Sequence, residues 1–167
     1  MNKVIDSKNL EELTVEELFE KIEKIFQKQS PSNWVCDHDI LHWFDLEKAN
    51  KEKMISFTPS IEALKKNTTE EEMLAHERSV LLPLRQALYQ VIEFIGNKQI
   101  PDGEWYNSPL IFLSTKDIYG ETCCLEFGRI FSHESSLVVY RVASDDVWGP
   151  GTRVLFDKEK ETKPVKN

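Results

Sequence analysis

Residues 81–96 read LLPLRQALYQVIEFIG, and their last residue, Gly96, marks a change in the pattern of the chain. Up to Ile95, apolar residues recur at spacings of three and four, as they do along one face of a helix. After Gly96 they alternate with polar residues, which is typical of strands. The order predicts an α+β fold in which N-terminal helices pack on one face of a C-terminal antiparallel sheet of about four strands, arranged as a meander.

The helical half contains recognisable helix starts. Thr14 and Glu17 have the spacing of a capping box and precede an apolar stripe. Pro59 follows Thr58 and is well tolerated in a first helical turn. Thr69 precedes three glutamates, which the positive end of a helix dipole favours, and Pro83 further on predicts a kink or a short break. The expected helices cover about residues 15–29, 34–49, 58–64 and 69–96.

The β half consists of apolar runs separated by turn residues. Strands are expected at about residues 110–115, 122–131, 137–143 and 152–157. We expect one α+β domain over residues 1–157, with its helical part at about 14–96 and its β part at about 105–157. Residues 158–167 are charged, contain Pro164 and offer no apolar anchor, so this tail is predicted to be disordered.

Composition restricts the class of protein. The chain has 167 residues and a formal net charge of −8, with an isoelectric point near 5.1. Phosphate contacts require clustered Lys and Arg, so nucleic-acid binding is not expected, whereas a basic protein would be attracted. Mild acidity also serves solubility alone. No apolar run approaches the roughly 20 residues of a membrane span, and the N-terminus lacks the apolar core of a signal peptide.

The cysteines indicate a reducing compartment. Their number is odd, and Cys123 and Cys124 are adjacent, so a disulfide framework is not expected. We therefore expect a cytoplasmic protein without a membrane contact; the oligomeric state stays open. Cys36 falls on the apolar stripe of the expected second helix and is interpreted as a small core residue.

The first candidate site combines His38, His42 and Asp45. On the expected second helix these side chains project from one side. Two imidazoles and a carboxylate can ligate zinc or iron and leave positions open for water or substrate, as in a metal-dependent hydrolase or oxygenase. The alternative is that the two histidines are solvated side chains that hold no metal.

The second candidate site consists of Arg129, Arg141 and Arg153, which lie twelve residues apart on three successive expected strands. Symmetric hairpins would align them across one face of the sheet. Such a row needs counter-charges and would suit a sensor of small anionic ligands. The alternatives are neutralisation by nearby carboxylates or by solvent, and a register slip of one residue removes the row.

The third candidate is the loop 145–151, which reads DDVWGPG. Asp145 and Asp146 place two carboxylates beside Trp148, and tryptophan is enriched among the residues that dominate binding energy at interfaces. With Trp105 and Tyr106 the loop could form one acidic, aromatic surface for a partner. In the alternative interpretation Trp148 folds back as a lid on the open end of the sheet.

The profile of a small, acidic α+β domain without a catalytic motif is similar to that of inhibitor and immunity proteins, which neutralise toxins by docking on them. The resemblance lies in composition and architecture alone. It implies a protein-binding module rather than an enzyme. Such a module needs no cofactor and neutralises a basic partner, such as a nuclease toxin, by occlusion. The metal-dependent enzyme and the anion sensor are the alternatives.

Overall fold

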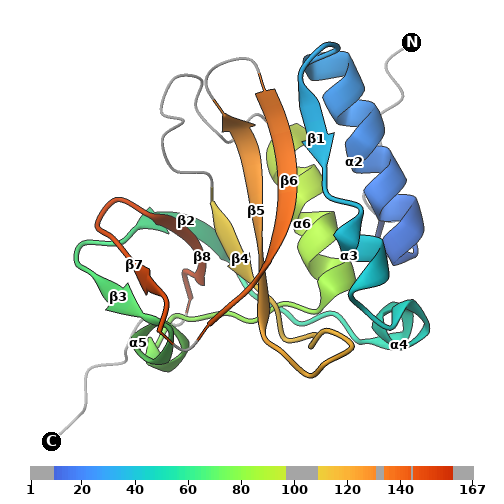
Figure 1. The fold of residues 1–167 in the computed structure, drawn as a ribbon. Helices are drawn as coiled ribbons and strands as arrows, with labels where there is room; N and C mark the ends of the chain where they lie inside the picture. Colours follow the sequence, from blue (N-terminus) through green and yellow to red (C-terminus); the bar gives the residue numbers. More distant parts are fainter. Residues whose placement is uncertain (1–9, 97–108, 131–133, 144, 160–167) are drawn as a thin grey trace, which may run out of the picture.

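The computed structural model describes residues 10–96, 109–130, 134–143 and 145–159. Two long helices and a sheet dominate this part of the chain (Figure 1). The helices are α2 (Val15–Gln29), α3 (Asp39–His42), α4 (Leu46–Lys51), α5 (Glu70–Ala75) and α6 (Leu84–Gly96). The strands are β1 (Trp34–Cys36), β2 (Pro59–Ala63), β3 (Thr68–Thr69), β4 (Leu110–Phe112), β5 (Cys123–Ile130), β6 (Glu134–Arg141), β7 (Val147–Trp148) and β8 (Arg153–Asp157).

The prediction of an α+β fold is confirmed, but that of a four-stranded meander is wrong. Six strands form a mixed sheet in the order β1-β6-β5-β4-β8-β2, and β3 pairs with β7 in a second, two-stranded sheet. Strand β1 pairs parallel to β6, and β2 pairs antiparallel to β8. The prediction failed because both edge strands come from the N-terminal half, where the sequence was interpreted as helical.

Helix α2 begins and ends where the sequence predicts. The Thr14 hydroxyl accepts a hydrogen bond from the Glu17 N–H at 3.2 Å, which satisfies one of the free donors of the first turn. The apolar stripe of α2 is buried against α6 and against the adjoining sheet face. Helix α6 begins at Leu84, whose N–H donates a hydrogen bond to the hydroxyl of Thr115 at 2.8 Å. This free backbone donor of the first turn is therefore also satisfied.

The expected second helix, residues 34–49, is wrong. Its first residues form β1, and two short helices follow, because the carboxylates of Asp37 and Asp45 each start a new turn. Asp37 accepts hydrogen bonds from the N–H groups of Asp39 at 2.9 Å and Val139 at 3.3 Å. Asp45 accepts one from the Lys48 N–H at 3.2 Å and begins α4. The apolar positions from Cys36 to Phe44 that resembled one helical stripe are therefore divided between β1, α3 and the bend after α3.

The expected helices at 58–64 and 69–96 are also revised. Residues 59–63 form β2, whose Ile61 pairs with Leu155 of β8. Thr69 does cap a helix, through a complete capping box with Glu72, but α5 ends at Ala75. A turn at residues 77–78 follows, and then Ser79 forms a β-bridge with Phe156 and Leu82 forms one with Leu113. The break predicted at Pro83 is thus longer than expected, because these residues find partners in the sheet.

Two apolar clusters lie on opposite faces of the sheet. Alternation along β5 sends Cys123, Leu125 and Phe127 into the core beneath α2 and α6. Cys124 enters a smaller cluster on the other face, where α5 and β7 contribute Met73 and Trp148. The packing of the two long helices on one face is confirmed (Figure 1). The small unit of β3, β7 and α5 partly covers the other face.

The C-terminal tail was predicted to begin at residue 158, but Lys158 still donates its N–H to the Thr58 carbonyl at 2.8 Å. Residues 160–167 lie outside the described residues. Within the described part of the chain, no helix has the length and apolar character needed to cross a membrane.

Candidate binding pocket

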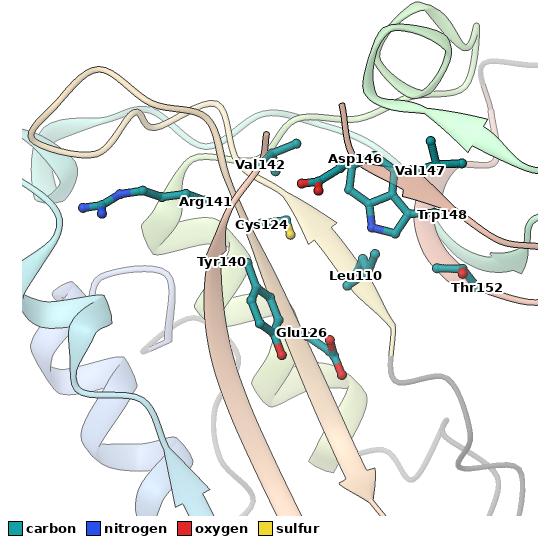
Figure 2. Close-up of a pocket in the computed structure, with 10 residues that line it drawn as sticks. All are labelled: Leu110, Cys124, Glu126, Tyr140, Arg141, Val142, Asp146, Val147, Trp148 and Thr152. Carbon is teal, nitrogen blue, oxygen red and sulfur yellow. The ribbon is translucent and has the colours of Figure 1, made fainter. Parts of the chain in front are cut away.

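A cavity of about 480 Å³ lies on the sheet face opposite the two long helices, where β5 and β6 approach β7 (Figure 2). Its volume falls within the range of about 300–1,000 Å³ that is usual for ligand sites. We call it the acidic pocket. Its described lining residues are Leu110, Cys124, Glu126, Tyr140, Arg141, Val142, Asp146, Val147, Trp148 and Thr152.

Strand alternation places Glu126 and Tyr140 on this face. Cys124 lies opposite Tyr140 in the register, and Glu126 is the next residue along β5 that points the same way. The Tyr140 hydroxyl and the Glu126 carboxylate lie side by side in Figure 2, and the hydroxyl acts to lower the pKa of Glu126. Tyr140 is 44% exposed, so the pocket opens to solvent at this end.

Trp148 forms the opposite wall of the acidic pocket. Its ring meets Phe112 edge-on, with the centroids 5.3 Å apart, and it packs against the smaller apolar cluster. Trp148 is therefore a partly buried lid, as in the second interpretation of the loop, and it still faces the cavity. One carboxylate oxygen of Asp146 accepts a hydrogen bond from the Ala143 N–H at 2.8 Å, which fixes the loop. Asp145 is exposed.

Two carboxylates give the pocket a negative potential. Burial raises the pKa of Glu126 above its usual value, and the hydrogen bond from Tyr140 offsets only part of this effect. The pKa of the Cys124 thiol is raised to about 12, first by burial and then by the charges of Cys123, Glu126 and Asp146. Glu126 lines the cavity beside Tyr140, and Asp146 lines it beside Trp148 (Figure 2). The thiol is protonated at neutral pH and is not a nucleophile.

Arg141 is the basic residue among the described lining residues, and its side chain points away from the cavity (Figure 2). Its Nε donates a hydrogen bond of 2.6 Å to Asp117. The guanidinium carbon lies 4.1 Å from the ring centroid of Trp43 and 5.1 Å from that of Tyr119. The positive charge of Arg141 is thus neutralised outside the acidic pocket.

The loop 116–121, here called the Tyr119 loop, borders a second hollow of about 360 Å³ that shares Arg141 and Val142 with the acidic pocket. Gly120 has a φ of 80°, a conformation that L side chains rarely adopt. Asp117 accepts hydrogen bonds at 2.9 Å from the N–H groups of Tyr119 and Glu121. This fixed loop leaves Tyr119 73% exposed.

The structure separates the candidate metal ligands. His38 precedes α3 with its ring 5.3 Å from that of Phe19, His42 ends the same short helix, and Asp45 caps the next one. All three are exposed. Within the described residues, no group of three or more His, Cys, Asp or Glu side chains is placed to hold a metal ion. The expected constellation failed because it required one continuous helix.

The arginine row is not formed. The pairing of β5 with β6 has another register than symmetric hairpins would give, because Ile130 pairs with Glu134, and Arg129 therefore lies opposite Ser135 instead of Arg141. Arg153 lies on β8, which β4 and β5 separate from β6. Sheet order and register thus place the three arginines apart.

Asp146 and Trp148 of the acidic pocket were expected as partner-binding residues from the sequence, and Arg141 was expected in another role, as an anion-binding residue. Trp105 and Tyr106 lie outside the described residues. The missed residues are Cys124, Glu126 and Tyr140, and a signal for one of them exists: Glu126 interrupts the otherwise apolar run CCLEF. A charged residue in a central strand needs a partner or a function.

Comparisons with protein-family models, with curated proteins and with solved structures find no match to this chain.

Proposed function

We propose that this protein is a protein-binding module that receives a basic protein partner on the face containing the acidic pocket, and that it acts as an inhibitor or immunity protein by occluding that partner. The observation that supports the proposal is the lining of the cavity. Two carboxylates, Glu126 and Asp146, and two aromatic rings, Tyr140 and Trp148, surround it. The basic residue among its described lining, Arg141, is directed elsewhere.

The chemistry of this lining suits recognition better than catalysis. Aromatic side chains with one polar end supply large contact area at low conformational cost, and they are enriched among hot spots. Trp148 is supported by Phe112 and Asp146 by Ala143, so little ordering is needed when a partner docks. The net charge of −8 adds a long-range attraction for a basic protein, which accelerates encounter at low salt.

The Tyr119 loop lies within reach of the same docking face. The hollow beside it shares Arg141 and Val142 with the acidic pocket. Ile118 and Tyr119 are 55% and 73% exposed on a fixed loop. We expect a large partner to cover both hollows, with the acidic pocket supplying charge selection and the Tyr119 loop supplying apolar contact.

The proposal is tested by capture and reconstitution. The tagged full-length chain is used as bait in an extract of its source cells, and each recovered protein is purified and titrated against the bait by calorimetry. We expect a basic protein that binds at one to one, whose affinity falls with rising salt and whose activity is lost in the complex.

The decisive comparison uses two double variants with the same change in net charge. Glu126→Gln with Asp146→Asn removes both pocket carboxylates and is expected to weaken the complex by roughly tenfold or more. Glu20→Gln with Glu47→Gln removes two exposed helix carboxylates far from the pocket and is expected to change the affinity much less. Equal effects of the two double variants, or a purified partner that keeps its activity in the complex, would contradict the proposal.

A further inference from the structure

The residues that surround the Arg141 guanidinium can be compared with those that line the acidic pocket. Its guanidinium contacts the rings of Trp43 and Tyr119 and donates to Asp117. A guanidinium suits such a setting because it is planar, stacks on aromatic faces and donates in a fixed direction to a carboxylate. This fold therefore already uses two aromatic rings and one carboxylate to hold an arginine.

The acidic pocket contains the same residue types on the other side of β6. Trp148 and Tyr140 supply two aromatic rings, and Glu126 and Asp146 supply carboxylates. Within the described residues no arginine or lysine side chain points into this cavity (Figure 2). The set of groups that satisfies Arg141 is thus present a second time, and no cation from the described residues occupies it.

We propose that the acidic pocket binds the guanidinium group of a single arginine side chain, which the basic partner inserts between Trp148 and Tyr140 to pair with Glu126 and Asp146. This inference rests on the proposed function, because it specifies which group of the partner enters the pocket. Its support is the charge complementarity of the lining, the cavity of about 480 Å³, and the matching arrangement around Arg141 in the same molecule.

The electrostatics of the pocket agree with this assignment. Burial keeps the pKa of Glu126 above its usual value, so an ionised Glu126 is poorly stabilised in the free protein. A cation beside the carboxylate would relieve that cost. Arginine is favoured over lysine because an ammonium is more strongly hydrated and lacks the plane that stacks between rings.

The test uses small probes and the full-length protein. Amide spectra of the ¹⁵N-labelled chain are recorded during titration with Nα-acetyl-arginine methylamide, with its neutral isostere Nα-acetyl-citrulline methylamide, and with Nα-acetyl-lysine methylamide. We expect saturable shifts at Glu126, Tyr140 and Trp148 with the arginine probe, weaker shifts with the lysine probe and none with citrulline.

Variants locate the site. Glu126→Gln with Asp146→Asn is expected to weaken binding of the arginine probe roughly tenfold, whereas Glu20→Gln with Glu47→Gln leaves it unchanged. Equal binding of citrulline or of lysine, or shifts spread over surface carboxylates, would overturn the inference.

The two proposals fail in different ways. If the arginine probe does not bind but a basic protein still forms a complex that depends on the pocket carboxylates, the arginine inference is wrong and the protein-binding module stands. If the probe binds in the pocket but no basic protein forms a complex, the arginine site stands and the module proposal is wrong.

Discussion

The Nε of Arg141 donates a 2.6 Å hydrogen bond to Asp117, whose side chain has no exposed surface. The pair connects the end of β6 to the Tyr119 loop. Burial opposes ionisation of Asp117, but the hydrogen bonds from Arg141 and from the N–H groups of Glu121 and Tyr119 outweigh it and keep the pKa of this carboxyl below its usual value. One carboxylate therefore sets both the shape of the loop and the direction of Arg141.

Replacement of Asp117 by Asn is expected to destabilise the fold by about 2–3 kcal/mol. Asparagine can still accept from the two loop N–H groups, but its amide presents a donor to Arg141. Chemical denaturation measures the loss. The exposed Asp145→Asn serves as the control and is expected to lie within about 0.5 kcal/mol of wild type. Equal stabilities of the two variants would contradict the role assigned to Asp117.

The dependence of folding stability on pH, below neutral pH, tests the role of Asp117 a second time. Because the folded pKa of Asp117 lies below the usual 3.8, its contribution is present at neutral pH and is lost as the pH falls through that folded value. The wild type is therefore expected to lose stability below about pH 4 more steeply than Asp117→Asn. Parallel curves for the two proteins would show that other carboxylates account for the loss of stability at low pH.

Glu126→Gln is expected to stabilise the free protein at neutral pH. A raised folded pKa means that the native state binds the proton more tightly, so stability declines as the pH rises from the usual 4.5 through the folded value. The neutral amide removes that decline. The groups that face Glu126 are Tyr140, Cys124 and Asp146; burial keeps the pKa values of the first two high, so they stay neutral in this range.

Thermal unfolding at several pH values measures this difference. The gain of Glu126→Gln over wild type is expected at pH 7 and should vanish below pH 4.5, where the glutamate is protonated in both states. Together with weaker binding of an arginine probe, the gain would identify a residue that lowers stability for the sake of binding. A loss of stability at pH 7 would mean that Glu126 serves the fold instead.

Trp148→Ala is expected to lower the free energy of unfolding by about 2–3 kcal/mol, because the ring is partly buried against Phe112. Trp148→Phe retains an aromatic contact and should cost about 1 kcal/mol. The phenylalanine variant is therefore the suitable one for binding measurements. Similar stabilities of the alanine variant and the wild type, measured by urea denaturation, would show that Trp148 is not the lid of the smaller cluster.

Gln86→Leu is expected to loosen the backbone around Ile55 from α6, while Arg85 still donates to the Glu52 carbonyl. The buried amide of Gln86 accepts a hydrogen bond from the Ile55 N–H and donates one to the Ile55 carbonyl, both at 2.7 Å. Water can replace these bonds because Ile55 is 43% exposed, so we expect a loss of about 1–2 kcal/mol.

Hydrogen exchange at the Ile55 amide provides the readout for this variant and is expected to accelerate. Gln90→Leu is the matched control, since Gln90 is equally buried on the same helix and its amide makes no hydrogen bond within the described part of the chain. Unchanged exchange in Gln86→Leu would show that other contacts hold the backbone around Ile55.

Short sequence patterns predicted the structure correctly where the interacting groups are close together along the chain. Helix α2 begins at the expected residue because Thr14 and Glu17 are three residues apart and one side chain satisfies the turn. The expected strands after Gly96 are present because their alternation reflects two faces of one sheet. The acidic, aromatic loop was found from Asp146 and Trp148, whereas the rest of the acidic pocket was not.

By itself, the sequence determined the helix starts, the β character of the C-terminal half and the negative charge. The tertiary structure decided the sheet order, the register and the site. Trp34 pairs with Ser135 and Ile61 with Leu155, and no local pattern reveals partners so distant along the chain. The same holds for the pocket, since Glu126, Tyr140 and Trp148 meet only when the hairpin register is set. Backbone N–H and C=O groups are alike at almost every residue, so they do not distinguish one strand pairing from another. The pairing and its register are therefore determined by how the side chains of the whole chain pack.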